Sequence, residues 1–246
     1  NMSVDILFAH KKVVSFEDAI GHLETCDIWN FFDKRAVSFI NKFSSLLLKY
    51  PGINQYPDLV ALAYWFRRAS IHKLEQRYAN DNDVFRVGRG LSLHIAPSNV
   101  DTIFVYSFFL SLLAGNSSFI RVSQNGSPQL DIIIQLFQDL YDAGETVTAG
   151  RFVICTYPHE NKATEIVSKR CELRVIWGGN ETVRTITAIP LNPTALEIKF
   201  PNRTSFSAIN LATLAKTADK ELIGLCDNLY ADIQLFGQKN QNIGEV

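Results

Sequence analysis

The sequence predicts an α/β protein with a doubly wound parallel sheet, preceded by a helical N-terminal segment over residues 1–83. Two observations predict this fold. From residue 84 onward, short β-rich apolar runs alternate with helical segments, which is typical of parallel strands joined by right-handed crossovers. The first 80 residues are instead helical in pattern. We therefore expect residues 84–246 to form the α/β domain and the N-terminal segment to pack on its core.

The spacing of apolar residues predicts three N-terminal helices. In the first, Ser15 and Asp18 resemble a capping box. The second ends at a break over Tyr50-Pro51-Gly52, and the third spans residues 58–78. The apolar faces consist of Ala36, Val37, Ile40, Phe43, Leu47 and Leu48 in the second helix, and of Leu59, Leu62, Ala63, Phe66 and Ala69 in the third.

The alternating region predicts five strands, at residues 91–96, 118–122, 151–155, 173–177 and 195–199. Helices are predicted between them, near residues 100–114, 128–142, 160–169 and 181–188. Ser127 followed by Pro128 marks the start of the second of these helices, because proline is favoured at the first helical position. A further strand at residues 206–210 and a helix at 218–235 close the chain.

Composition excludes several classes of protein. Hydrophobic residues make up 47% and charged residues 20% of the 246 residues, as in soluble globular proteins. The net charge is -1 without a basic block, so we expect no nucleic-acid partner. Arg67, Arg68 and Lys73 are interpreted as a solvated helix face, with an anion site as the alternative. The apolar stretch at residues 104–114 is shorter than the roughly 20 residues of a membrane span.

The cysteines predict neither a disulfide framework nor a metal site. Cys26, Cys155, Cys171 and Cys226 form no C-x-x-C pair and have no metal-ligand spacing. Two of them lie in apolar surroundings, which favours buried, reduced thiols. Reduced thiols in turn favour a cytoplasmic location.

Three segments converge at the carboxyl edge of the predicted sheet, where ligands bind in doubly wound folds. They are Pro97-Ser98-Asn99, residues 121–124, and residues 177–181. In the last of these, Gly178 and Gly179 precede a helix, so a phosphate could approach exposed backbone N–H groups there. A plain tight turn is the alternative explanation for this glycine pair.

The order of these segments resembles the cofactor-binding half of the aldehyde dehydrogenase superfamily. The stretches "HIAPSNV", "LLAGNSSFIRVSQ", "VIWGGNETVR" and "LEIKFPNRTSFSAI" carry the resemblance, over roughly residues 84–240. Within the superfamily they are most similar to the acyl-CoA reductase family that includes the fatty acyl-CoA reductase of bacterial luminescence. The resemblance implies a Rossmann variant that holds its dinucleotide without a G-x-G-x-x-G fingerprint. It also implies reduction of a fatty acyl thioester, on CoA or an acyl carrier, to an aldehyde. A homo-oligomer, or a complex with acyl-transfer partners, is the expected assembly.

The resemblance assigns a cofactor site. Arg121 stands where the superfamily usually has a lysine that contacts the adenosine ribose, and Gln124 where NAD-preferring members have a glutamate. A neutral Gln124 would not repel a 2′-phosphate and Arg121 would attract one, so we expect NADP(H) to be preferred over NAD(H). The turn under the pyrophosphate matches Gly178, Gly179 and Asn180, and the remaining cofactor-binding candidates are Pro97, Ser98 and Ser123.

The resemblance also assigns two catalytic roles. Asn99 matches the asparagine whose amide helps form the oxyanion hole; capping of the following helix is the alternative. Glu197 matches the general base of many members, and a solvent-facing strand residue is the alternative.

The nucleophile that the family's reaction requires has no counterpart here. The family's cysteine position aligns with Gln241, and glutamine cannot form the acyl thioester. Cys226 lies too early, in an apolar helix where we expect a buried thiol of raised pKa. Two explanations remain: the sequence is part of a longer reductase whose catalytic cysteine domain is absent from this chain, or it is a degenerate member that serves as a non-catalytic dinucleotide-binding or assembly module. In either case we expect this chain alone to be inactive.

Overall fold

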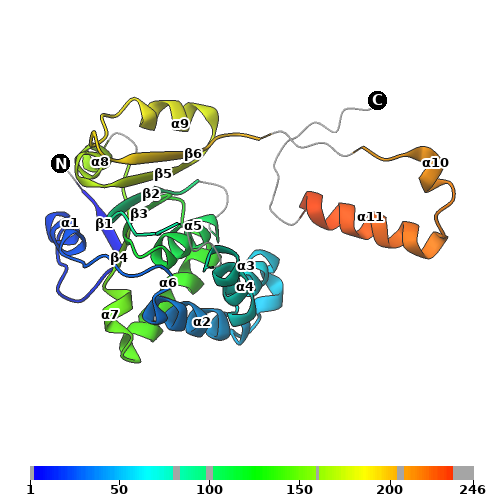
Figure 1. Cartoon of the computed structure of the whole chain (residues 1–246), viewed down its shortest axis with the longest axis horizontal. Coiled ribbons are helices and arrows are strands. Elements are labelled where there is room, and N and C mark those ends of the chain that lie inside the picture. The colour runs from blue at the N-terminus through cyan, green and yellow to red at the C-terminus, as the bar shows by residue number, and fades with distance from the viewer. Residues whose placement is uncertain (1–2, 80–83, 98–101, 159–160, 204–207, 235–246) are drawn as a thin grey trace. The chain divides into compact units, whose positions relative to one another are not determined.

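The computed structural model describes residues 3–79, 84–97, 102–158, 161–203 and 208–234. The chain divides into two compact units, Asn1–Pro201 and Asn202–Val246. The larger unit contains the six-stranded sheet, and the smaller contains α10 (Leu211–Leu214) and α11 (Asp219–Gln234) (Figure 1). Among the described residues, no helix is both long and apolar enough to cross a bilayer.

The sheet has the strand order β1-β4-β3-β2-β5-β6, and five of its strands are parallel. These five are β2 (Leu91–Ile95), β3 (Ser117–Val122), β4 (Phe152–Thr156), β5 (Leu173–Trp177) and β6 (Leu196–Phe200). They confirm the predicted α/β fold and the five predicted strands to within a residue at each end. Strand β1 (Asp5–Phe8) was not predicted; it pairs antiparallel with β4 at one edge of the sheet. Its four residues, of which only Phe8 is buried, are too few for an alternating pattern to be recognised.

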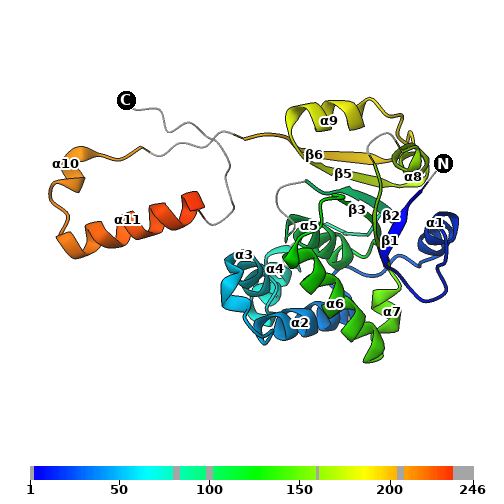
Figure 2. The ribbon, with the colours of Figure 1, turned by 180° about the vertical axis from the view of Figure 1, so that it is seen from behind.

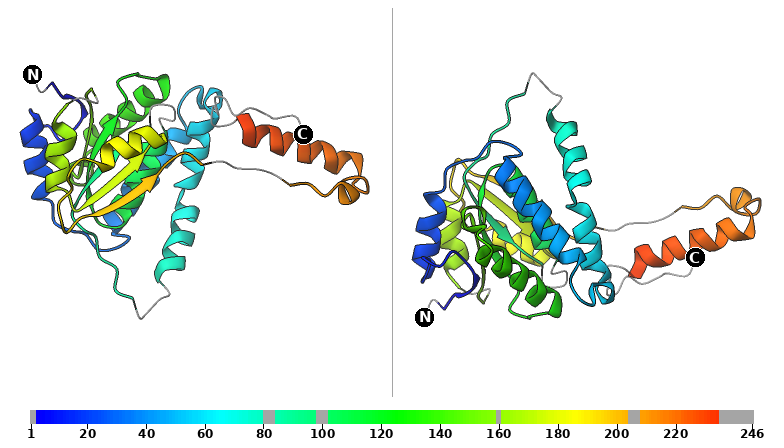
Figure 3. Two further views of the ribbon diagram at one scale, coloured as in Figure 1. Left: turned by 90° about the horizontal axis from the view of Figure 1, so that it is seen from above. Right: turned by 90° about the horizontal axis from the view of Figure 1, so that it is seen from below.

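Helices cover both faces of the sheet (Figures 1 and 2). The helices α5 (Thr102–Leu113) and α6 (Pro128–Asp142) pack on one face, with α2 (Lys34–Leu48) and α3 (Pro57–Trp65) outside them. The opposite face is covered by α1 (Phe16–Glu24), α8 (Ala163–Arg170) and α9 (Asn180–Thr187). Figure 3 shows α1 and α8 side by side, where Arg170 forms ion pairs with Glu17 and Glu24. The short helix α7 (Thr146–Ala149) follows α6.

The core between the sheet and α2, α5 and α6 is rich in phenylalanine. Phe137 of α6 stacks on Phe43 of α2 with ring centroids 4.7 Å apart, and Phe152 of β4 lies 4.8 Å from Phe108 of α5. Burying an aromatic side chain contributes about 2 kcal/mol, so this cluster is a major source of the stability of the larger unit.

In the N-terminal segment Ser15 caps α1, since Ser15 Oγ accepts a hydrogen bond from the Asp18 backbone at 3.1 Å. The Asp18 carboxylate accepts from the Ser15 hydroxyl at 2.8 Å, so the described contacts include the serine cap of the predicted capping box. The single helix predicted over residues 58–78 is wrong: the chain forms α3 and then α4 (Arg68–Ala79). Between them Phe66 leaves the helical region, at φ -109° and ψ 13°, and its ring packs 5.0 Å from that of Phe109. After this break Ala69 is exposed and Ile71 is buried instead. Strand β1 belongs to the N-terminal segment and yet pairs with β4 in the sheet, so this segment is not a separate helical layer. A domain boundary near residue 84 stays a prediction.

The smaller unit differs from the prediction at one end. Residues 208–210 form no strand, and Asn210 instead caps α10 by accepting hydrogen bonds from the backbones of Ala212 and Thr213. Asparagine is among the best residues for this position, which explains the difference. The rest of the predicted strand, residues 204–207, lies outside the described residues. The predicted helix near residues 218–235 is confirmed as α11.

Candidate functional site

The carboxyl ends of the parallel strands meet at one edge of the sheet. Ile95 of β2 pairs with Arg121 of β3 on one side and with Ile176 of β5 on the other. The helices that follow β2 and β3 lie on one face of the sheet, and those that follow β4 and β5 on the other. The winding therefore reverses between β2 and β5, which is where doubly wound sheets form a ligand crevice.

The predicted segments are brought to this edge. Pro97 follows β2, Ser123 and Gln124 follow β3, and the Gly178-Gly179 pair follows β5. Ser98 and Asn99 lie outside the described residues, so the oxyanion role of Asn99 stays a prediction.

The glycine pair opens α9 without a side-chain cap. Gly179 occupies the N-cap position in an extended conformation, at φ -62° and ψ 163°, and Asn180 begins the helix as an exposed residue. The Gly178 backbone donates to the Phe200 carbonyl at 3.3 Å, and a Cβ on Gly178 would lie 3.1 Å from Cβ of Thr182. The first N–H groups of a helix have no partner within it, so this helix end suits a phosphate.

The Arg121 side chain is buried, with 5% of its surface exposed. It points to the α1 and α8 face, where Nη2 donates to the Tyr157 carbonyl at 3.1 Å and the guanidinium lies 5.7 Å from the Tyr157 ring centre. Burial lowers the pKa of Arg121. Ser123 is also buried, and its Oγ accepts a hydrogen bond from the Asn125 backbone, whereas Gln124 is exposed. Arg121 is therefore enclosed by protein, whereas Gln124 is open to solvent.

Glu197 is not brought to the carboxyl edge. It stands second in β6, opposite Arg174 of β5, and forms an ion pair with that buried arginine. Arg174 Nε donates to Glu197 Oε2 at 2.6 Å, while Nη1 donates to Ser168 Oγ and the Ile189 carbonyl, each at 3.0 Å. A carboxylate that balances a buried guanidinium has a structural task, so the general-base role has no support in this geometry.

Sequence reasoning missed a buried polar chain that ends at the carboxyl edge. Trp177 Nε1, at the end of β5, donates to Ser107 Oγ of α5 at 3.2 Å. Ser107 Oγ lies 2.8 Å from His94 Nδ1, and His94 Nε2 lies 3.0 Å from Ser92 Oγ. Burial lowers the pKa of His94 to about 3. The only signal in the sequence is the presence of serine and histidine inside the apolar strand "LSLHI".

The cysteines agree with the predictions at two positions and differ at one. Cys155 and Cys171 are fully buried, and burial raises both pKa values, that of Cys171 to about 11. Cys226 is exposed, so the prediction of a buried thiol there is wrong. Its apolar neighbours Ile223 and Leu225 are exposed as well, because nothing in the described part of the smaller unit covers this helix. Gln241 lies outside the described residues.

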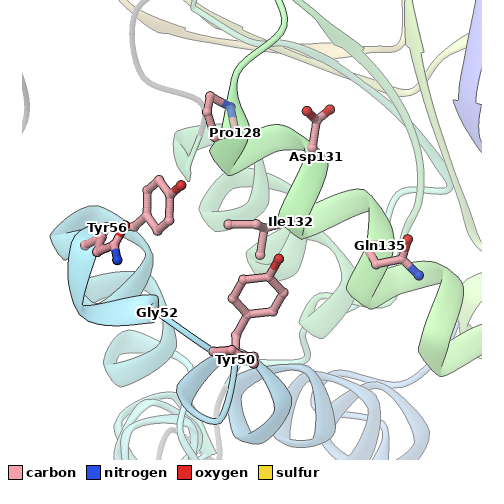
Figure 4. Close-up of a pocket in the computed structure, with 9 residues that line it drawn as sticks. Tyr50, Gly52, Tyr56, Pro128, Asp131, Ile132 and Gln135 are labelled. Atoms are coloured by element: carbon pink, nitrogen blue, oxygen red, sulfur yellow. The ribbon is translucent and has the colours of Figure 1, made fainter.

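Two cavities lie beside the start of α6, on the opposite face from α9. One, of about 480 Å³, is lined by Tyr50, Tyr56, Asp131, Ile132 and Gln135, and Figure 4 shows the two tyrosine rings facing α6 across it. The other, of about 380 Å³, shares Asp131 and Gln135 with the first and reaches Ser123 and Gln124. Neither includes the glycine pair.

Comparison with known proteins gives a family and a fold. A family model described as acyl-CoA reductase (LuxC) matches residues 67–240. Among solved structures, an NAD-dependent benzaldehyde dehydrogenase from Corynebacterium glutamicum is similar, with a TM-score of 0.56 and 13% identity over 81% of this chain and 51% of that chain. A betaine aldehyde dehydrogenase from Staphylococcus aureus in complex with NAD⁺ gives 0.58 and 13%, over 80% of this chain and 46% of that chain.

An NAD⁺ complex of aldehyde dehydrogenase from Bacillus cereus gives a TM-score of 0.57 and 11% identity, over 79% of this chain and 44% of that chain. At such identities these structures show the fold, which is that of aldehyde dehydrogenases. The chain spans about half the length of these three aldehyde dehydrogenases. Among curated proteins, none matches the chain.

Proposed function

Because the chain belongs to the acyl-CoA reductase (LuxC) family, we propose that it supplies the dinucleotide site of an enzyme that reduces a fatty acyl thioester to an aldehyde. The observation that supports this most is the start of α9, which lacks a side-chain cap and follows β5 beside the crevice at the β2–β5 reversal. Its free N–H groups and positive dipole end would hold the pyrophosphate. Solved structures of the same fold contain NAD⁺, which supports a nicotinamide dinucleotide as the ligand.

The proposed cofactor is NADP(H), and Arg121 is the residue that would select it. The Arg121 guanidinium gives one described hydrogen bond, to a neutral carbonyl, and is otherwise surrounded by protein that lowers its pKa. A 2′-phosphate would provide a charged acceptor, which is a stronger partner than a carbonyl. The side chain would have to turn from Tyr157 toward the edge of the sheet, while the exposed, neutral Gln124 would leave the phosphate unopposed.

The proposed reaction takes a hydride from the cofactor to an acyl group held on a cysteine as a thioester. We propose Asn99 as the amide donor to the oxygen that becomes negative in that step. Cys155 and Cys171 are buried in the sheet region, so neither suits the nucleophile. The acyl thioester substrate, on CoA or a carrier protein, is proposed from the family alone.

Titration of the chain with NADPH and NADH, side by side, tests the cofactor proposal. We expect NADPH to bind more tightly, and Arg121→Ala to weaken NADPH by about 1.5–3 kcal/mol with a much smaller effect on NADH. Equal weakening of both cofactors would remove Arg121 as the selecting residue. Failure of the folded chain to bind either cofactor would contradict the proposed site itself.

Incubation with a long-chain acyl-CoA tests the proposed position of the nucleophile. We expect no acyl adduct on this chain by mass spectrometry, because Gln241 stands at the nucleophile position. Gln241→Cys should permit acylation, because it would place a thiol at the position that matches the family's cysteine. An adduct on Cys226 of the unmodified chain would show that the nucleophile has been placed wrongly.

A further inference from the structure

We propose that Ser107 and His94 are positioning residues that fix the Trp177 indole as one wall of the crevice between β2 and β5. This inference rests on the proposed function, since the crevice is where the dinucleotide would bind. The Trp177 indole would provide an aromatic contact for a planar ring of the dinucleotide, and the two buried residues would orient this indole. Trp177 itself would touch the cofactor, whereas Ser107 and His94 act through it.

The shortest hydrogen bonds of this polar chain favour one direction. Ser92 Oγ lies 2.7 Å from the Ser117 carbonyl, which can only accept, so the single Ser92 proton is directed there. Ser92 then accepts from His94 Nε2 at 3.0 Å, a shorter contact than the 3.5 Å between His94 Nε2 and the Ser118 hydroxyl, which would otherwise donate to this nitrogen. A neutral imidazole has one N–H, so His94 Nδ1 is an acceptor and Ser107 donates to it, at 2.8 Å. The remaining lone pairs of Ser107 receive the Trp177 N–H, at 3.2 Å.

This direction makes Ser107 a fixed acceptor rather than a rotating hydroxyl. Its proton is committed to His94, and His94 is in turn held by Ser92. All three side chains are at least 90% buried, so no bulk water competes for these bonds. The indole N–H at the end of β5 is therefore anchored to the core of the protein through α5 and β2.

Two contacts position the Trp177 indole, namely the hydrogen bond to Ser107 and the stacking on Phe200. Phe200 of β6 stacks on one face of Trp177, with ring centroids 3.8 Å apart and planes inclined by 10°. Strands β6 and β2 flank β5 on opposite sides, so the other face of the indole is turned to the β2 side. Pro97 and the reversal crevice lie there, and Gly178 follows Trp177 directly. A ring stacked on this face would lie next to the proposed pyrophosphate turn.

Two serines of α5, one turn apart, provide a matched pair of variants. Ser107 and Ser111 are both buried, with 8% and 6% of their surface exposed, and each belongs to the same polar cluster. Ser111 contacts Ser92 and Asn116 but not Trp177. Ser107→Ala removes the indole acceptor, whereas Ser111→Ala removes an equally buried hydroxyl and leaves the path from Trp177 to Ser92 intact.

The experiment is nuclear magnetic resonance of the tryptophan indole N–H groups during titration with NADPH. The chain has three tryptophans, and Trp177→Phe identifies the resonance that belongs to Trp177. In the wild-type chain we expect NADPH to shift this resonance. Ser107→Ala should move it in the free protein and weaken NADPH about tenfold. Ser111→Ala should do neither.

Two results would overturn the inference while the proposed function stands. One is saturable NADPH binding that leaves the Trp177 resonance unmoved. The other is an equal loss of affinity in Ser107→Ala and Ser111→Ala, which would indicate a general effect of disturbing the cluster. If the wild-type chain binds no dinucleotide at all, the proposed function fails and the inference fails with it.

Discussion

Removing the Glu197 carboxylate should destabilise the larger unit, because it leaves the Arg174 guanidinium buried without a counter-charge. The Arg174 side chain is 2% exposed and the Glu197 side chain 14% exposed. Breaking a buried ion pair from one side costs about 3–5 kcal/mol. Arg174 keeps its bonds to Ser168 and the Ile189 carbonyl, which favours the lower part of this range. For a unit of this size, about 3 kcal/mol corresponds to a Tm lower by about 6–12 °C.

The assay is thermal unfolding of Glu197→Ala followed by circular dichroism. Glu181→Ala is the matched control, because Glu181 pairs with Arg184 at side chains that are 86% and 74% exposed, and such pairs contribute little. The double variant Arg174→Met/Glu197→Leu should recover most of the loss, since it removes both charges. An unchanged Tm in Glu197→Ala would refute the structural role and leave the carboxylate free for general-base catalysis.

Three further predictions follow from the site and its surroundings. Gly179→Val should abolish binding of both cofactors with an unchanged circular dichroism spectrum, because φ -62° and ψ 163° suit valine while its side chain would block the phosphate; retained affinity would place the phosphates elsewhere. The native pKa of His94, about 3, lies below its ordinary value of 6.5, so the unfolded chain binds the extra proton and stability falls as pH drops through this window. Between pH 7 and 5, this loss of unfolding free energy is about 2 kcal/mol. Denaturant titrations of His94→Asn at the two pH values should not show this loss. An identical pH dependence in the variant and the wild type would contradict the burial of a neutral imidazole. Cys226 should react with a maleimide in the native chain and Cys155 only after unfolding, as peptide mapping would show; native labelling of Cys155 would contradict the packing of β4.

The parts of the fold that could be predicted from sequence are those decided locally. Ser127 and Pro128 specify the start of α6, and Ser127 Oγ does accept the Leu130 N–H at 3.0 Å. Strands β2 to β5 are buried apolar runs long enough to be recognised. The break between α3 and α4 could not be predicted in this way, because it depends on Phe66 packing against Phe109 of a helix far along the chain.

In the candidate site, too, the position of the segments could be predicted from the sequence, whereas the contacts of individual side chains could not. The meeting of the segments after β2, β3 and β5 follows from the rule for doubly wound sheets and needs no side-chain detail. The partners of individual side chains depend on tertiary packing. Arg121 lies against Tyr157, Glu197 pairs with Arg174 across two strands, and Trp177 reaches Ser107 on a helix 70 positions earlier in the sequence. No spacing in the sequence encodes these contacts.

The central claim is that the dinucleotide binds at the carboxyl edge of the sheet, over the start of α9. Hydrogen–deuterium exchange of the backbone, with and without saturating NADPH, tests it most directly. We predict slower exchange in peptides that cover residues 120–125 and 176–183, and no change over residues 50–56, which line the cavity beside α6. Protection confined to residues 50–56 and 128–135, with none at the start of α9, would contradict the claim.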